Sequence, residues 1–262
     1  MTNKKLKKGA AIITGASRGI GAEIARKLSK DGFPVVINYL KSKDKAESVL
    51  KEIQNKGGNG VIYQADVVND TQVKAMFTKA EEIFGDIEVL INNAGGSIIN
   101  NSFKELTWKN IETQIQVQLK GSFNTCKHVI PLMENLGRGK IVNITSIYAD
   151  STPPVKTYDY TIAKAALSSF TKSLATEYGP KGIKINNVAP GMTETSLIGN
   201  IPERTKMVTQ MQTPLRRLAT VEDIASVVSA LVGETLLTID SNKLVATKTG
   251  TSLDFAKEII RL

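Results

Sequence analysis

The chain has 262 residues, of which 41% are hydrophobic and 23% are charged, as is usual for a soluble globular protein. This length favours one large α/β domain, and no apolar stretch reaches the roughly 18 residues that a membrane span needs. The formal net charge is +9, and aromatic residues make up only 5%, so a nucleic-acid-binding surface is not expected. The basic balance instead favours an acidic substrate or carrier.

The N-terminal end is rich in lysine, and we expect residues 1–8 to form a basic, flexible segment. It lacks the apolar core of a signal peptide. The chain has one cysteine, Cys126, which rules out an intrachain disulfide and favours a cytoplasmic location. It also has one histidine, His128, so neither a Ser-His-Asp triad nor a His-rich metal site is available, and no metal is expected.

Short apolar runs alternate with amphipathic segments along the chain. Strands are expected at 10–14, 35–38, 61–64, 89–92, 140–145 and 184–188, and helices at 20–30, 43–56, 71–84, 108–133, 159–178 and 222–232. The long helical pattern is interrupted near Gly121 and is expected to end at Pro131. This alternation predicts a single domain over residues 1–262, with a Rossmann-like, doubly wound parallel sheet covered by helices on both faces. Residues 191–218 have weak periodicity and two prolines, which favours a lid over a substrate pocket.

A glycine-rich turn at residues 14–21 follows the first expected strand. Its glycines at 15, 19 and 21 allow a tight turn and a close approach of the backbone to a pyrophosphate at a helix N-terminus. In a doubly wound sheet the dinucleotide binds after this first strand. Alone, the motif could also be a strand-to-helix turn without a ligand.

The end of the second expected strand indicates which cofactor is used. NAD enzymes usually have an acidic residue there for the ribose 2′-hydroxyl, but this chain has none before Asp44. Three cations, Arg18, Lys41 and Lys43, are close in sequence to this point or to the glycine-rich turn. The pattern favours the 2′-phosphate of NADP(H), unless Lys41 and Lys43 are only solvated loop residues.

Tyr160 and Lys164 are four residues apart on an expected helix and therefore share one face. An ammonium beside a phenol favours the phenolate, so we expect Lys164 to lower the pKa of Tyr160. Ser146 closes an expected strand and could add a hydroxyl to the same site. Together with the phosphate-binding turn, these residues predict nicotinamide-dependent carbonyl chemistry. Taken singly, they could instead be an interface tyrosine, a solvated lysine and a strand-end cap.

The motifs together resemble the short-chain dehydrogenase/reductase family, and most closely its 3-oxoacyl-(acyl-carrier-protein) reductase branch, over about residues 8–234. The resemblance rests on the order and spacing of residues 14–21, residues 92–95, Ser146, Tyr160 with Lys164, and residues 190–191. It implies that Tyr160 protonates the carbonyl oxygen, that Ser146 orients the carbonyl, and that Lys164 binds the nicotinamide ribose and lowers the pKa of Tyr160. The cofactor-binding residues that it implies are Gly15, Ser17, Arg18, Gly19, Ile20, Gly21, Asn38, Tyr39, Asp66, Val67, Asn93, Ala94, Gly95, Tyr160, Lys164, Pro190, Gly191, Thr193 and Thr195.

Two features depart from the family pattern. Gln118 replaces an asparagine that helps to hold a proton-relay water, and it is one methylene longer with the same amide groups, so we include it among the catalytic candidates. The segment 236–262 lacks the usual Gly-Gly turn, and residues 252–262 could form a short amphipathic helix. This end often forms a subunit interface in the family, so the choice between a homotetramer and a homodimer stays open.

The resemblance implies NADPH-dependent reduction of a ketone, with a 3-oxoacyl thioester as the leading substrate. Arg138 and Lys181 each precede a glycine and could receive an acidic acyl carrier protein, or they could be solvated loop cations. Polar residues at 149–158 leave open an NADP-dependent alcohol, sugar or specialised-metabolite ketone dehydrogenase. The alternative from another class is a non-catalytic nucleotide-binding protein.

Overall fold

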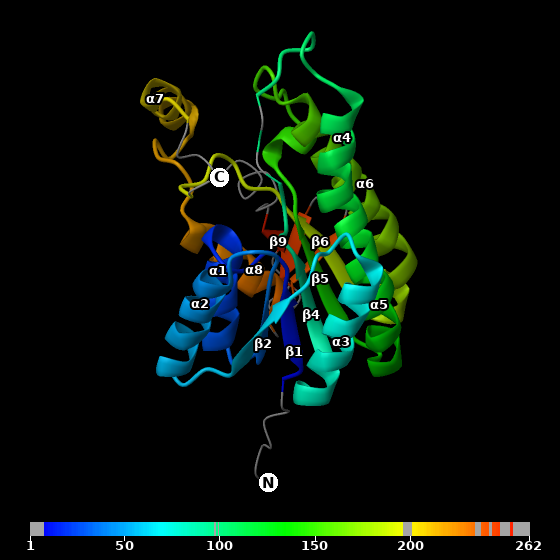
Figure 1. The fold of residues 1–262 in the computed structure, drawn as a ribbon. Helices are drawn as coiled ribbons and strands as arrows, with labels where there is room; N and C mark the ends of the chain where they lie inside the picture. The colour runs from blue at the N-terminus through cyan, green and yellow to red at the C-terminus, as the bar shows by residue number, and fades with distance from the viewer. Residues whose placement is uncertain are drawn as a thin grey trace.

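The computed structural model describes residues 8–96, 98, 100–195 and 201–233, together with the backbone of 237–240, 243–246 and 252–253. Six parallel strands form the central sheet in the order β3-β2-β1-β4-β5-β6, as Figure 1 shows. The strands are β1 Ala10–Ile13, β2 Val35–Tyr39, β3 Gly60–Gln64, β4 Ile87–Asn92, β5 Gly139–Ile144 and β6 Ile183–Val188. The predicted doubly wound α/β fold is confirmed, and each predicted strand is present within two residues at either end.

Helices cover both faces of this sheet because successive strand side chains point in opposite directions. Ile13 belongs to the core on the face of α1 Gly19–Lys30, α2 Lys43–Asn55 and α8 Val221–Val232. Its neighbour Ile12 belongs to the core on the face of α3 Asp70–Phe84 and α5 Gly121–Leu136. Both side chains are fully buried, which explains why the strands are continuous apolar runs rather than alternating ones.

The long helical pattern at 108–133 forms three consecutive segments, α4 Trp108–Ile115, the π-helical turn η1 Gln116–Lys120, and α5. The predicted end at Pro131 is wrong, since α5 continues to Leu136 and ends at Gly137, where φ is +64°. Pro131 is exposed, and so is Lys127, whose carbonyl group loses its helical partner. Water can solvate that carbonyl while the buried Val129 and Met133 hold the helix against the sheet.

Four other helical segments follow β5 or β6 along the chain. The helix α6 Tyr158–Tyr178 packs beside α4, and the short 3-10 turns η2 Ile147–Ala149 and η3 Gly179–Lys181 flank it along the chain. The helix α7 Glu203–Gln212 lies within the expected lid and was not predicted. In Figure 1 it stands apart from the helices that cover the sheet.

The C-terminal strands β7 Leu237–Asp240, β8 Lys243–Ala246 and β9 Ser252–Leu253 form an antiparallel sheet. The predicted helix at 252–262 is therefore wrong for its first two residues, because they pair with β8. Residues 254–262 and 1–7, on which the other terminal predictions fall, lie outside the described residues. Among the helices described, none has the length and apolar character needed to cross a membrane.

Candidate active site

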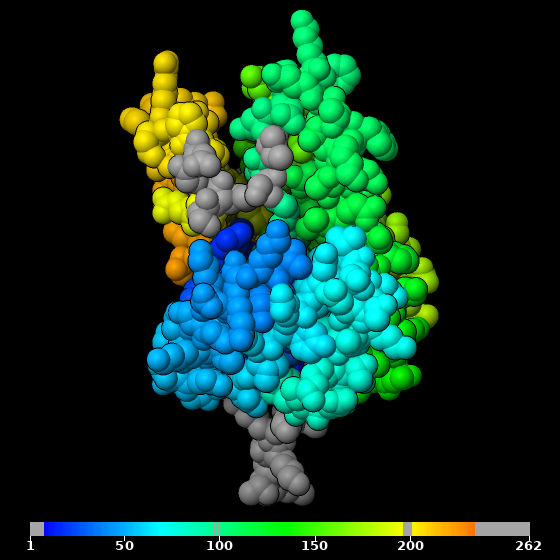
Figure 2. Space-filling view, viewed as in Figure 1, coloured from blue at the N-terminus to red at the C-terminus, as the bar shows by residue number. Residues whose placement is uncertain are grey.

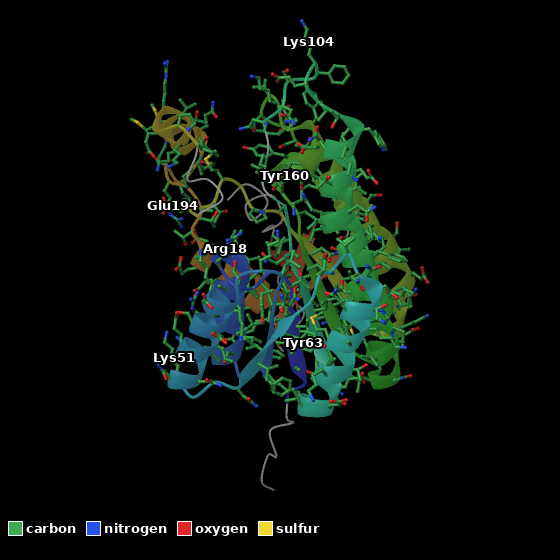
Figure 3. The ribbon with its side chains drawn as sticks, viewed as in Figure 1. Arg18, Lys51, Tyr63, Lys104, Tyr160 and Glu194 are labelled. Carbon is green, nitrogen blue, oxygen red and sulfur yellow. The ribbon has the colours of Figure 1, made fainter. Side chains whose placement is uncertain are left out.

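The candidate site lies at the carboxyl ends of the strands, near the point where the strand order reverses between β1 and β4. Figure 3 shows Arg18, Tyr160 and Glu194 at this end of the molecule, whereas Lys51 and Tyr63 lie toward the other end. In the space-filling view of Figure 2, the surface is hollowed between the region of α7 and the region of α4. The fold therefore gathers the residues of the sequence motifs at one edge of the sheet.

The glycine-rich turn is shaped by contacts that leave no room for side chains. Gly15 and Gly19 have φ of +62° and +57°, in the left-handed region that favours glycine. A Cβ atom on Gly15 would lie 2.9 Å from Ala94 Cα, and one on Gly21 would lie 2.9 Å from Gly15 O and overlap Asn93 Nδ2. Part of the requirement for glycine thus comes from packing of the turn on the loop after β4.

Three polar side chains hold the turn in place. Asn93 Nδ2 donates to Thr14 O at 2.9 Å and to Gly15 O at 3.1 Å, and Thr14 Oγ1 accepts from the backbone N–H groups of Asn93 and Ala94. Asn38 Oδ1 accepts from Gly15 N at 3.2 Å, and Asn38 Nδ2 donates to Ala65 O at 3.0 Å. Asn38 therefore connects the turn to the residue that follows β3. The side chain of its neighbour Tyr39, also predicted to bind cofactor, is buried in the core.

Arg18 is the N-cap of α1 and is exposed, beside the backbone N–H groups of the first helical turn, which includes Ile20. Ser17 lies in the preceding turn. Lys41 is also exposed, but Lys43 forms an ion pair of 3.5 Å with Glu47 on the same helix. This pair supports the interpretation of Lys43 as a solvated surface residue, while Arg18 and Lys41 stay candidates for the 2′-phosphate.

The other predicted cofactor residues also lie near the carboxyl edge. Asp66 Oδ1 accepts from Val68 N, which fixes the loop after β3, and Val67 O accepts from Asn124 Nδ2 of α5. Gly95 follows the loop residues Asn93 and Ala94, which are bound to the turn. After β6, Pro190 O accepts from Ile147 N, Thr193 Oγ1 donates to Gly191 O, and Thr195 lies against Gly19.

Ser146, Tyr160 and Lys164 come together where β5 ends and α6 begins. Lys164 Nζ donates to Ile144 O at 2.7 Å and lies 5.7 Å from the centre of the Tyr160 ring. Ser146 Oγ accepts from Tyr148 N at 3.3 Å, which leaves the Ser146 hydroxyl proton available for another acceptor. Ser146 and Lys164 are buried, and Tyr160 is partly buried.

The electrostatics of Tyr160 differ from the prediction. Burial raises the pKa of Tyr160 above its ordinary value, and a hydrogen bond from Ser146 only partly offsets this. Burial also lowers the pKa of Lys164 from 10.5 to about 8. The expected lowering of the Tyr160 pKa by Lys164 is not found, because burial dominates both groups and the lysine bonds to Ile144 O. The phenol is consequently a protonated donor at neutral pH.

Gln118 lies in η1 and is buried at 1% exposure. Its Nε2 donates to Gln114 Oε1 at 2.6 Å. Gln114 was not singled out from the sequence, although its spacing of four residues from Gln118 on an expected helix was a usable signal. The predicted role of Gln118 in catalysis stays a prediction.

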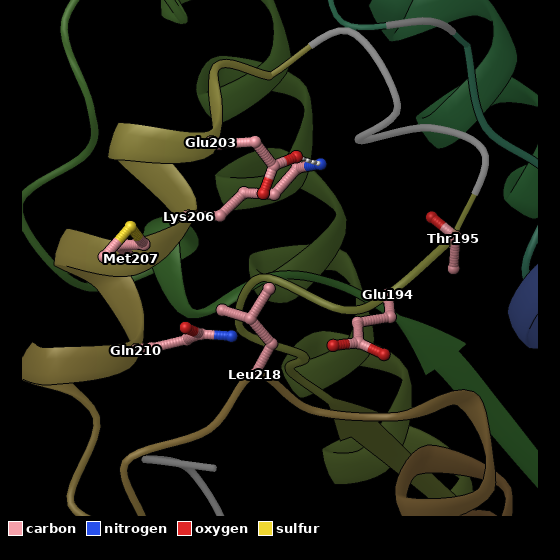
Figure 4. Close-up of a pocket in the computed structure, with 7 residues that line it drawn as sticks. All are labelled: Glu194, Thr195, Glu203, Lys206, Met207, Gln210 and Leu218. Carbon is pink, nitrogen blue, oxygen red and sulfur yellow. Dashed lines mark hydrogen bonds and ion pairs between the residues drawn. The ribbon is translucent and has the colours of Figure 1, made fainter.

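The predicted lid borders a cavity of about 270 Å³ between α7 and the segment after β6. Figure 4 shows the residues that line it, including Glu194, Thr195 and Leu218 on one side and Met207 on α7. Lys206 and Glu203 of α7 form an ion pair of 2.6 Å at this cavity. Thr193 pairs with Ala219, which brings the start of the expected lid beside the residue that follows its end.

The two cations predicted to receive a carrier protein lie elsewhere. Arg138 and Lys181 precede β5 and β6, so they are at the amino ends of these strands, at the edge opposite Ser146. Arg138 pairs with Glu88, and Lys181 pairs with Glu134 at 2.6 Å. Within one chain, this placement favours the alternative that they are surface cations with structural partners.

Comparisons with known proteins agree with this geometry. The family model described as Enoyl-(Acyl carrier protein) reductase matches residues 15–246. The 3-oxoacyl-[acyl-carrier-protein] reductase FabG of Staphylococcus epidermidis is 38% identical over 226 residues, which cover 86% of this chain and 91% of that protein. Glucose 1-dehydrogenase 2 of Bacillus subtilis is 30% identical, with 86% and 87% covered. A short-chain dehydrogenase of Burkholderia cenocepacia J2315, in complex with NADP, has a TM-score of 0.80 at 31% identity, with 88% and 92% covered.

The chain therefore belongs to the short-chain dehydrogenase/reductase family. It is an NAD(P)-dependent oxidoreductase that acts on CH–OH or C=O groups. The predicted family resemblance and class of enzyme are confirmed. The identity of the substrate is not fixed by these matches, because reductases of acyl-carrier-protein substrates and a glucose dehydrogenase both resemble this chain.

Proposed function

We propose that the protein uses NADPH to reduce a ketone, with a 3-oxoacyl thioester as the substrate. The observation that carries the proposal is the convergence of Ser146, Tyr160 and Lys164 at the same carboxyl edge of the sheet as the glycine-rich turn. The similarity to a 3-oxoacyl-[acyl-carrier-protein] reductase supports the substrate class.

The residues around the turn fit a dinucleotide phosphate. The turn leads into the N-terminus of α1, where backbone N–H groups beside the exposed Arg18 suit a phosphate group. No acidic residue stands at the end of β2, and the exposed cations Arg18 and Lys41 favour the 2′-phosphate of NADP(H) over a free ribose hydroxyl. The NADP in a structural relative supports the same choice.

When bound, NADPH supplies the hydride, and the chain's own groups handle the carbonyl oxygen. The neutral phenol of Tyr160 donates a proton to that oxygen, and the Ser146 hydroxyl donates a hydrogen bond that orients it. Lys164 would hold the nicotinamide ribose, and its positive charge would stabilise the negative charge that develops on the phenol oxygen. Ile144, which receives the Lys164 hydrogen bond, fixes the position of the ammonium.

A second candidate is an NADP-dependent alcohol or sugar dehydrogenase, which the similarity to Glucose 1-dehydrogenase 2 favours. The exposed segment 150–155 after η2 contains Asp150 and Ser151, which suit a polar substrate. A non-catalytic nucleotide-binding protein is the least supported alternative, because the convergence of Ser146, Tyr160 and Lys164 supports a catalytic role.

The proposal includes a homotetramer or homodimer in the cytoplasm. Phe123 of α5 and Ile162 of α6 expose 48% and 43% of their surfaces, and these apolar groups suit an interface between copies of the chain. An acyl carrier protein is the proposed source of the thioester, by analogy with the relative named above.

The substrate is tested by measuring kcat/KM with NADPH for an acetoacetyl thioester and for a panel of sugars, polyols and simple ketones. The proposal expects the thioester to be preferred by a large factor, since the ratio of kcat/KM values measures differential stabilisation of the transition states. Preference for a sugar or polyol would instead support the second candidate. Binding of NADPH without turnover of any substrate would support the non-catalytic one.

A further inference from the structure

Two buried asparagines stand side by side in the central sheet, near its carboxyl edge. Asn92 of β4 and Asn143 of β5 are register partners on neighbouring strands. The strand β5 pairs with another strand on either side, and such buried parallel strands usually carry apolar residues. A buried carboxamide destabilises the fold unless its groups are paired. Asn143 therefore calls for a role that an apolar side chain could not perform.

The two asparagines belong to a chain of hydrogen bonds that runs in one direction from α5 to α6. Thr125 Oγ1 of α5 donates to Asn92 Oδ1 at 2.6 Å, and Asn92 Nδ2 donates to Asn143 Oδ1 at 2.8 Å. Asn143 Nδ2 donates to Thr171 Oγ1 of α6 at 2.7 Å, and Thr171 Oγ1 donates to Leu167 O at 2.8 Å. Because Asn92 occupies its oxygen, Asn143 presents its amide nitrogen to α6.

The contact with Thr171 lies on the face of α6 that also carries Lys164. Seven residues make about two helical turns, so the two side chains share one face of the helix. Lys164 Nζ donates to Ile144 O, and Ile144 is the residue of β5 that follows Asn143. Two side-chain hydrogen bonds thus join neighbouring residues of β5 to one face of α6.

The next strand makes a weaker contact with the same helix. Asn187 of β6 is the register partner of Asn143, and its Nδ2 lies 3.4 Å from both Ser168 O and Ser168 Oγ. Among the described residues, Asn187 Oδ1 is buried without a hydrogen-bond partner. Because 3.4 Å is long for an N–H···O hydrogen bond, Asn143 provides the firmer attachment of α6.

A directional attachment matters because of how a helix packs. Apolar packing alone tolerates repacked arrangements of similar stability, so it does not fix one position closely. A slip of one residue moves a helix about 1.5 Å along its axis and turns it by about 100°. The hydrogen bonds at Lys164 and Thr171 oppose both movements, since each requires a set distance and angle. A displacement of about 1 Å can lower a reaction rate about 100-fold, so the position of α6 bears on Tyr160.

We propose that Asn143 is a positioning residue, which holds α6 through Thr171 at the position from which Tyr160 acts. Asn92 extends this attachment to the cofactor side of the site, because the next residue, Asn93, donates to the glycine-rich turn. One chain of hydrogen bonds thereby places the proton donor relative to that turn. The effect on the rate rests on the proposed function, whereas the attachment of α6 does not.

Two substitutions of Thr171 separate the hydrogen bond from packing. Thr171→Val keeps the shape of the side chain and removes its hydroxyl, whereas Thr171→Ser keeps the hydroxyl and leaves a small cavity. With NADPH and an acetoacetyl thioester, we expect Thr171→Val to lower kcat about tenfold or more while the KM for NADPH stays within about twofold. Thr171→Ser should restore kcat to within about threefold of the wild-type value, although its fold is less stable. A wild-type kcat in Thr171→Val, or an equal loss in both variants, would overturn the proposal.

A matched control and a paired substitution complete the kinetic test. Thr176→Val changes an exposed threonine of the same helix, whose Oγ1 donates to Lys172 O, and it should leave kcat at the wild-type value. If Thr171→Val does not fold, Asn143→Leu is added to it, because replacing both polar partners by apolar groups of similar shape costs little stability. The paired variant should show the same loss of kcat, and a wild-type kcat in it would overturn the proposal.

The attachment of α6 is tested without any substrate. Crystal structures of the wild-type protein and of Thr171→Ser should keep Lys164 Nζ within hydrogen-bond distance of Ile144 O. In Thr171→Val, or in the paired variant, α6 should be displaced and this hydrogen bond lengthened or broken. An unmoved α6 with the bond intact would overturn the proposal. This result is independent of which carbonyl compound the enzyme reduces, so failure of the proposed function and failure of the positioning role can be told apart.

Discussion

Lys164 Nζ donates a 2.7 Å hydrogen bond to the main-chain carbonyl of Ile144, the last residue of β5. The bond ties α6 to the carboxyl end of the sheet and thereby sets where Tyr160 stands, four residues earlier on the same helix. It also places an ammonium group in a buried environment, where burial lowers its pKa to about 8. The contact thus fixes the position of the ammonium, and its burial lowers the pKa.

This shifted pKa makes the stability of the cofactor-free protein depend on pH. Below about pH 8, Lys164 is protonated in both the folded and the unfolded chain, so it does not make the free energy of unfolding depend on pH. Between about pH 8 and 10.5 only the unfolded chain keeps the proton, so the free energy of unfolding rises with pH, by a contribution on the order of 3 kcal/mol. We expect Lys164→Met to lose this contribution in urea unfolding, while Lys172→Met, on the exposed face of α6, keeps it. The same rise in both variants would contradict the burial of the ammonium.

Arg18 should discriminate between the two nicotinamide cofactors. Because it is exposed at the N-terminus of α1, Arg18→Ala should raise the Kd for NADPH about 10-fold or more, the loss expected for a charge-assisted contact to phosphate, and change the Kd for NADH little. Lys43→Ala is the control, since Lys43 pairs with Glu47. Fluorescence titration of the reduced cofactors measures both constants. Equal weakening of both cofactors would show that Arg18 does not contact a 2′-phosphate.

Gly21 should tolerate no side chain. In Gly21→Ala the new methyl group would meet Gly15 O and displace Asn93 Nδ2, which holds Thr14 O and Gly15 O. We expect a loss of about 1–3 kcal/mol in unfolding free energy and a weakened affinity for NADPH. Gly179→Ala is the matched control, because a Cβ atom there meets nothing within 4 Å. Denaturant unfolding and cofactor titration of both variants test this, and a wild-type affinity in Gly21→Ala would refute it.

The sequence predicts the sheet and the main helices well because each strand is a short apolar run and each helix has one apolar face. It predicts the meeting of Ser146, Tyr160 and Lys164 because the spacing of the last two fits a helix and the first closes a strand. The predicted helix end at Pro131 is wrong because the buried Val129 and Met133 hold the helix against the sheet. A prediction from the local sequence does not include this tertiary packing. The direction of the Tyr160 pKa depends on burial, which only the assembled fold reveals.

The most direct test of the account is the turnover of an acetoacetyl thioester with NADPH by Tyr160→Phe, beside the wild-type protein. The change removes the phenol hydroxyl and keeps the ring that lies near Lys164. The account predicts that kcat falls at least about 100-fold, as expected for loss of a general acid, while the Kd for NADPH stays close to the wild-type value. Turnover at the wild-type rate by this variant would contradict the role of Tyr160 as the proton donor.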